Sequence, residues 1–319
     1  MDAAIARLAS AIELDDDDPR PVGVAVYELF QLGKSLDRSG KAVLSAKLEP
    51  LLRSQPLERL GKVALLAGAL LETGGDALAL PAAIFERIAE ALATVEVSAE
   101  GAPDFELPEA FYQFESAATA ALSRSQELRR SLPQRALIQA RSQRYRERYG
   151  RLNKLLSVLE SEPVIVLHPE TGRGWQCRIS GIVDNFQLHA LLLAAFAGEG
   201  ADRIEGHVPS AEAIAAAGTG EGMHGGWVDS SWQLANWPAL RPGGEIADHT
   251  SGHWIWNEGF PAEIALLDGM RIVLVGPGIN RRWNVERQFS EMPGHLIVEA
   301  AIPDAQQQLT RILSRVSDG

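Results

Sequence analysis

The chain has 319 residues, of which 46% are hydrophobic and 23% charged, values that are ordinary for a globular protein of two domains. Its formal net charge of −12 argues against the protein as a whole being a nucleic-acid binder. One cysteine excludes an internal disulfide, and the longest apolar run, Val63 to Leu71, covers nine positions, too few to span a bilayer. The start Met1-Asp2 lacks a basic signal segment, so we expect a cytoplasmic protein without a membrane segment.

Composition divides the chain into two halves that meet near residues 155–165. The last lysine is Lys154, whereas all seven tryptophans and all seven histidines lie between His168 and His295. The first 160 residues carry 20 basic and 23 acidic residues, a net charge of −3, and the remainder carries 10 basic and 19 acidic residues, a net charge of −9. We therefore predict an α+β protein, with an α-helical assembly or interaction domain over 1–160 and an α+β domain over 161–319 that holds the functional site.

Helical spacing dominates the first half. Leucine and alanine recur three and four residues apart, with Gly and Pro between the runs, which predicts a bundle of about six helices. Ser131 and Gln134 fit a capping box that opens one long helix to about Glu160. The other predicted helices cover residues 1–13, 21–36, 41–52, 57–71, 81–93 and 107–128.

One stretch of the first half, Arg124 to Lys154, is strongly basic, with ten basic residues against Glu127 and Glu147. If it is helical, its central arginines share one face that would bind an anion or nucleic acid. The alternative is a solvated face, or one directed at the acidic second half. Stacking aromatics are few, so nucleic acid is the less favoured partner. The arginines of this face are Arg141, Arg144, Arg148 and Arg151.

The second half changes to strand spacing. A buried strand is predicted over 163–168 and a half-buried strand over 175–180, which together form a hairpin. Asp184 and Gln187 then fit the start of a helix that stops at Gly198. The remaining elements of a mainly antiparallel or mixed sheet domain are a helix over 210–217, strands over 253–257, 271–276 and 295–302, and a final helix from Asp304 to about Val316.

Residues 218–252 show no period and are predicted to be a long loop rich in Gly and Trp. A small core accounts for some of the tryptophans in and after this loop. We hypothesise that the loop instead forms an aromatic-lined recognition surface or lid for a ligand or a partner protein. The tryptophans of this surface are Trp227, Trp232, Trp237, Trp254 and Trp256.

A cluster of potential acid, base and metal-ligand groups is formed by His168, Glu170, Asp184 and His189. The first two end a predicted strand, and the other two lie on the following helix, so a hairpin would bring them together. As metal ligands, His168, His189 and Asp184 suit Zn²⁺ or Fe²⁺ with an open coordination position, and all four residues are candidate catalytic groups. Their spacing matches no established signature, and Asp184 and His189 also fit structural roles as helix cap and helix lining.

Other motifs carry weaker indications. Gly276-Pro277-Gly278 resembles a nucleotide-binding turn only superficially, since proline offers no amide to a phosphate. Arg281 and Arg282 beside it would hold an anionic ligand or partner. Cys177 alternates with apolar neighbours and is predicted to be a buried, unreactive thiol, and Ser230 lies outside any nucleophile elbow.

No motif fixes a reaction, so we favour a binding or adaptor protein whose helical half assembles with itself or a partner and whose Trp/His-rich half recognises a ligand or protein. Two alternatives stay open. One is a metal-assisted enzyme, hydrolase-like or oxygenase-like, that uses the 168–189 cluster with a divalent metal as cofactor. The other is a nucleic-acid-associated protein that uses the basic segment 124–154.

Overall fold

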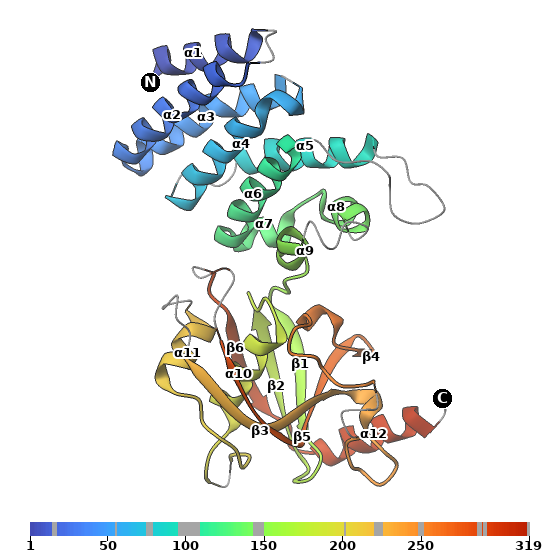
Figure 1. Ribbon diagram of the computed structural model, residues 1–319. Helices are drawn as coiled ribbons and strands as arrows, with labels where there is room; N and C mark the ends of the chain where they lie inside the picture. The colour runs from blue at the N-terminus through green and yellow to red at the C-terminus, as the bar shows by residue number, and fades with distance from the viewer. Residues whose placement is uncertain are drawn as a thin grey trace. The chain divides into compact units, whose positions relative to one another are not determined.

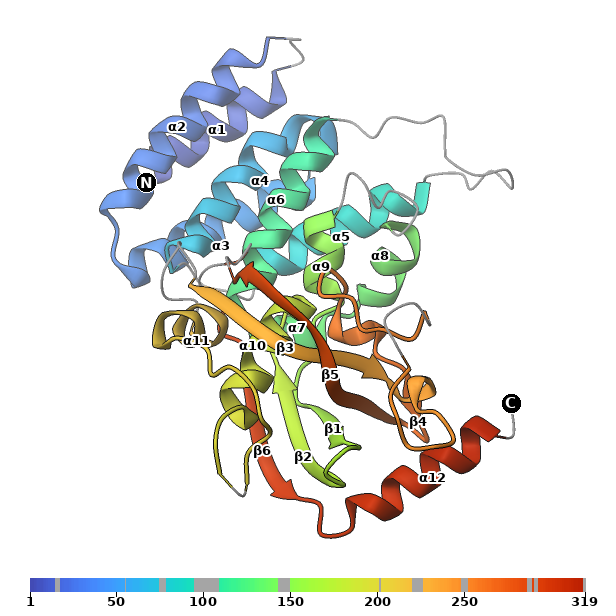
Figure 2. The same ribbon diagram turned by 60° about the horizontal axis from the view of Figure 1, so that its bottom comes forward.

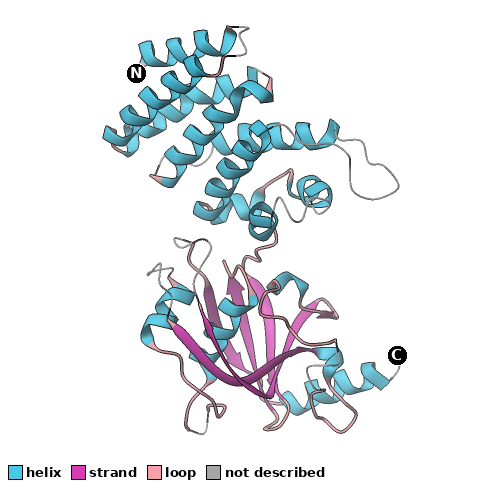
Figure 3. Cartoon of the chain, viewed as in Figure 1, coloured by secondary structure: helices cyan, strands magenta, loops and turns pink. Residues whose placement is uncertain are grey.

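The computed structural model describes residues 1–14, 18–54, 56–74, 79–94, 109–142, 150–200, 202–219, 226–247, 252–285, 289 and 292–317. The predicted α+β fold class is confirmed: the described residues of the first part form helices, and a mixed sheet with helices forms the second part (Figures 1 and 3). The chain divides into two compact units, Met1–Leu156 and Ser157–Gly319. None of the described helices is long and apolar enough to cross a membrane.

The first unit contains nine helices in its described part, and most begin and end close to the predicted positions. Buried leucines at helical spacing supply much of its apolar core, and α6 adds buried alanines and phenylalanines. The helices are α1 (Asp2–Glu13), α2 (Arg20–Ser35), α3 (Arg38–Ser54), α4 (Leu57–Glu72), α5 (Ala79–Thr94), α6 (Glu109–Arg124), α7 (Gln126–Ser131), α8 (Arg135–Ser142) and α9 (Gly150–Leu156).

Helices α4 and α6 pack closely because small residues meet along both. A Cβ atom on Gly68 would lie 3.0 Å from the Cα atom of Ala117, and one on Gly61 would lie 2.9 Å from the Cα atom of Ala110. The two glycines and the two alanines are each seven residues apart, two helical turns, so the contact repeats along one seam.

The basic segment 124–154 departs from the single long helix that the sequence predicts. Ser131 ends α7 and donates its hydroxyl to the carbonyl of Glu127, so it does not cap a following helix. Arg129 is buried and donates to the carbonyls of Leu122 and Ser123 at the end of α6. These arginine contacts satisfy carbonyls that a helix end leaves unpaired. Of the predicted arginine face, Arg144 and Arg148 lie outside the described residues.

The second unit is built on a mixed sheet. The strand order is β3-β5-β1-β2-β6, with β4 paired to β5, and the pairing of β1 with β5 is parallel while the other pairings are antiparallel. The strands are β1 (Glu162–His168), β2 (Arg173–Ser180), β3 (Trp227–Asn236), β4 (Leu266–Leu267), β5 (Met270–Asn284) and β6 (His295–Ala301). The hairpin of β1 and β2 is therefore confirmed.

Helices cover both faces of this sheet. Along β5, Val273 and Val275 join a core with α10 (Asn185–Phe196) and α11 (Ala211–Gly218). Ile272 and Leu274 join a second core with α12 (Ala305–Ser317). Figure 2 shows α10 and α11 on one side of the sheet and α12 on the other. Alternate residues point to opposite faces, so a central strand between two helix layers is apolar on both.

The prediction of a loop over 218–252 is wrong for Trp227–Asn236, because these residues form strand β3. It pairs with β5 from Trp227 opposite Asn284 to Asn236 opposite Val273. Its inward residues alternate, Val228, Ser230, Trp232 and Leu234, but the polar Ser230 and the flanking glycines conceal the period.

Strand β5 is much longer than the predicted 271–276. Gly276-Pro277-Gly278 lies inside it, beyond the pairing with β1, where β5 pairs with β3 and proline is tolerated. A Cβ atom on Gly278 would lie 3.0 Å from the backbone of Trp232 and Gln233, so glycine permits the close approach. The predicted strand over 253–257 is reduced to one isolated bridge between Trp254 and Ala235.

We expect Cys177 to resist thiol reagents in the folded protein. Its side chain is 1% exposed, and burial raises the pKa of the thiol to about 12. The reactive thiolate is therefore both scarce and inaccessible at neutral pH. Labelling with iodoacetamide, followed by mass spectrometry, should be slow in buffer and complete in guanidinium chloride. Rapid labelling of the native protein would contradict this placement.

Candidate functional site

Helix α10 is buried almost all round, and the polar side chains of its first half find partners inside the unit. Nine of its twelve residues are buried. Asp184 caps it by accepting a hydrogen bond from the backbone N–H of Gln187, as predicted. Asn185 donates to the carbonyl of Trp256, and the Gln187 amide donates to the carbonyl of Ala217. These contacts fix the segment around residue 256 and the end of α11 against α10.

His189, one turn further along α10, faces Ser230 of strand β3. Its Nε2 atom lies 3.1 Å from the Ser230 hydroxyl oxygen, which also accepts the backbone N–H of Trp232 at 3.0 Å. The Asn257 side chain lies within reach of the imidazole, although Nδ1 makes no hydrogen bond of good geometry. The ring also packs on Trp283, with 4.8 Å between centroids.

Burial decides the charge of His189. The side chain is 3% exposed, and loss of hydration lowers its pKa to about 4. The polar side chain of Asn257 nearby opposes this lowering of the pKa, and the positive charge of Arg281 adds to it. The imidazole is therefore neutral at neutral pH, as the buried polar environment requires.

A tryptophan–arginine cluster, formed by Trp254, Trp256 and Arg281, adjoins these buried groups. The Arg281 guanidinium lies 4.5 Å above the centre of the Trp254 ring, and the two indoles are 6.2 Å apart. Trp254 is buried, whereas Trp256 is 62% exposed. Arg281 is exposed, and it has no hydrogen bond or ion pair within the part of the chain that the structure describes.

Three buried polar atoms near this cluster also lack a partner among the described residues. They are Oδ1 of Asn185, Nδ1 of His189 and Nε1 of Trp283. Trp283 lies two residues after Arg281 on β5, so both side chains project from the same face of the strand. Buried polar atoms without partners are uncommon in proteins and mark places where water or a ligand group completes the set.

The other predicted tryptophans have different positions. Trp232 is buried and donates to the carbonyl of Glu205, and Trp237 is half-buried and donates to the carbonyl of Leu266. Trp227 is 53% exposed, and Arg282 lies 5.1 Å above its ring while pairing with Asp229 at 3.5 Å. Because successive strand residues alternate, Arg282 belongs to the opposite face of β5 from Arg281.

The predicted metal cluster is not assembled among the described residues. His168 is buried at the end of β1, with Nδ1 2.8 Å from the Thr171 hydroxyl and Nε2 4.0 Å from the Glu170 carboxylate. Burial lowers the pKa of His168, and Glu170 opposes the shift. Asp184 caps α10, and His189 faces Ser230. No group of three or more His, Cys, Asp or Glu side chains in the described ranges is placed to hold a metal ion.

The contact of Ser230 with His189 resembles the pairing of a nucleophile with a general base. Such a serine must reach a substrate carbonyl, yet Ser230 is 2% exposed. Its oxygen also accepts a backbone N–H, which ties it into strand β3. In this conformation the pair is a structural link between α10 and β3.

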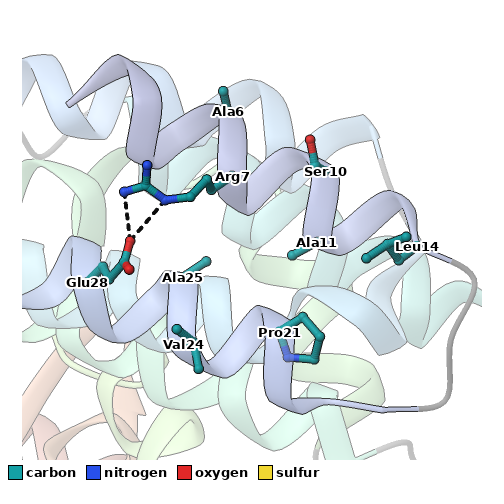
Figure 4. A pocket seen from close by; sticks show the side chains of 9 residues that line it. All are labelled: Ala6, Arg7, Ser10, Ala11, Leu14, Pro21, Val24, Ala25 and Glu28. Carbon is teal, nitrogen blue, oxygen red and sulfur yellow. Dashed lines mark hydrogen bonds and ion pairs between the residues drawn. The ribbon is translucent and has the colours of Figure 1, made fainter.

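The helical unit carries a separate groove of about 420 Å³ between α1 and α2 (Figure 4). Apolar side chains line most of it, including the exposed Leu14 and Val24. Arg7 and Glu28 meet across it at 2.8 Å, as the dashed lines in Figure 4 show. The sequence pattern gave no indication of this groove, because it depends on how two helices pack.

Sequence reasoning missed Asn257 and Trp283 as site residues and assigned Ser230 no role. Trp283 carried a usable signal, since it alternates with Arg281 on an extended segment. Ser230 and Asn257 carried none, because their importance comes from contacts with His189 across the fold. No protein-family model, curated protein or solved structure matches this chain.

We expect the free energy of unfolding to decrease as the pH is lowered, because of His189. Its pKa is about 4 in the fold and about 6.5 in the unfolded chain, so protonation favours unfolding. The contribution of the neutral imidazole to stability is fully present above pH 6.5 and is lost as the pH falls towards 4. By pH 5 the free energy of unfolding should have decreased by about 2 kcal/mol on this account. The free energy of unfolding, measured with guanidinium chloride at about pH 7.5 and about pH 5, tests this expectation.

His189→Gln should be less stable than the wild type at the higher pH and should lose less on acidification. His207→Gln, which alters an exposed histidine of the same unit, is the matched control and should behave like the wild type. An equal acid-induced loss in wild type and His189→Gln would refute the assignment.

Proposed function

We propose that this chain is a non-catalytic binding protein whose α+β unit recognises an acidic segment of a partner protein. The observation that carries the proposal is Arg281, which lies over Trp254 beside the exposed Trp256. Stacking on an indole holds the guanidinium plane in place and leaves its edge N–H groups directed outwards. Those groups match a carboxylate in two-point geometry.

The aromatic neighbours support the same assignment. Trp256 offers a large exposed ring, and tryptophan and arginine are the residue types that contribute most to protein interfaces. A carboxylate on Arg281 with an apolar side chain on Trp256 would use both features. The cluster is open to solvent, which fits a docking protein segment better than a small molecule, since small ligands are usually enclosed.

An adaptor needs a second contact, and the groove between α1 and α2 supports one. Its apolar lining and the exposed Leu14 and Val24 provide surface for assembly, either with another copy or with a further partner. The helical unit would then bind a second copy or a further partner, and the α+β unit would bind the acidic segment.

The two alternative functions have less support. A metal-assisted enzyme needs a ligand set that the described residues do not bring together. A nucleic-acid surface on the segment 124–154 has less support, because Arg129 and Arg135 donate to helix-end carbonyls and offer fewer N–H groups to phosphates.

Substitution of Arg281 should weaken binding to acidic peptides by about tenfold or more, since it removes the carboxylate contact. The probe is an array of peptides in which Asp or Glu alternates with apolar residues, with hits quantified by fluorescence polarisation. Arg281→Gln and Trp256→Ala should each reduce affinity.

Matched controls lie on the opposite face of β5. Arg282→Gln makes the same change in charge, and Trp227→Ala removes an equally large exposed ring. Both should leave the affinity nearly unchanged. The proposal fails if no acidic peptide binds, or if Arg281→Gln and Arg282→Gln reduce binding equally.

A further inference from the structure

Strand β6 lies at the edge of the sheet and is exposed on both faces. Six of its seven residues are exposed, and Leu296 is half-buried. Ile297 is 57% exposed and Val298 is 43% exposed, and these neighbours point to opposite faces. Within the described residues, β6 pairs with β2 and with no strand on its other side. Its outer edge therefore presents backbone N–H and C=O groups to solvent.

The centre of β6 has the composition of an interior strand. Leu296 to Val298 is apolar on both faces, like the run Val164 to Leu167 of β1, which the two cores of this sheet cover. Free edges are usually protected by charged side chains, proline, β-bulges or a very short strand. Strand β6 has seven residues without lysine or proline, and its one acidic side chain, Glu299, is paired with Arg178. Its one irregularity is the shift opposite Gln176 and Cys177, which leaves Glu299 as the extra residue.

We propose that β6 pairs antiparallel with β6 of a second copy of this chain, about a two-fold axis perpendicular to the sheet. Such an axis keeps each face of one sheet continuous with the same face of the other. Directly opposite residues must then share a face, which restricts the register to shifts of two residues. The edge that each copy exposes is satisfied by the identical edge of the other.

The polar side chains His295 and Glu299 favour one register between the two copies of β6. With Ile297 opposite Ile297 of the second copy, Leu296 lies opposite Val298, and His295 lies opposite Glu299. Both polar side chains of the strand then have a polar neighbour, and the apolar ones meet each other. Arg178 already holds the Glu299 carboxylate at 2.6 Å, which fixes its position for the imidazole. The two neighbouring registers place Ile297 opposite a polar side chain, Glu299 in one and His295 in the other.

The first test is the molar mass of the full chain, measured by size-exclusion chromatography with light scattering over a range of micromolar concentrations. The wild type should be a dimer. Ile297→Lys places two like charges opposite each other at the axis and should give a monomer that still unfolds cooperatively, because the side chain is exposed in the single chain. Its melting temperature should not depend on concentration, whereas that of the wild type should rise with concentration. Leu266→Lys, at a 51% exposed position on β4, is the matched control and should stay dimeric.

The second test fixes the register. Opposite Cβ atoms lie about 5 Å apart in an antiparallel pair, within the reach of a disulfide after small adjustment. Ile297→Cys should therefore form a covalent dimer on oxidation, and Leu266→Cys should not. The native Cys177 is buried and does not compete. The proposal is overturned by a monomeric wild type, by a dimer that Ile297→Lys leaves intact, or by Ile297→Cys that cross-links no better than Leu266→Cys.

Discussion

The α+β unit depends on one constraint, the near-complete burial of a helix that begins with polar residues. Helix α10 packs in one core with the sheet and α11, so Asn185, Gln187 and His189 have little access to water. An unpaired buried polar group costs about 1–3 kcal/mol, and each of these side chains therefore contacts a different part of the chain. Asn185 holds the segment before Asn257, Gln187 holds the end of α11, and His189 holds β3. The packing of a helix thus sets the positions of three separate segments.

The long strand β5 links this buried network to the surface. Its first half is a central strand, apolar on both faces, and its second half pairs with β3 beyond the reach of β1. That second half places Arg281 and Trp283 on one face, beside the neutral imidazole of His189. A protonated His189 would lie close to the Arg281 guanidinium. Burial and this repulsion act in the same direction, so the site keeps a single fixed cation.

Two environments of arginine contrast in this protein. Arg129, Arg135 and Arg271 donate to backbone carbonyls, where the charge stabilises chain ends and turns. Arg281 instead lies on an indole, which provides attraction without occupying its donors. The distinction matters for function because a guanidinium whose N–H groups are already used offers little to a ligand. Basic residues along a sequence therefore do not locate an anion-binding surface until their neighbours are known.

The sequence alone determined the fold class, the hairpin of β1 and β2, the cap of α10 by Asp184 and most helix boundaries, because these follow from local periodicity and from hydrogen bonds a few residues apart. Tertiary structure decided the rest. Trp227–Asn236 becomes a strand because β5 supplies its hydrogen-bond partners, and Gly276-Pro277-Gly278 stays extended because β3 passes close to it. The roles of Ser230, Asn257 and Trp283 arise only when His189 is brought to them from α10. Such contacts join residues tens of positions apart, and local sequence carries no record of which distant group will satisfy a buried polar atom.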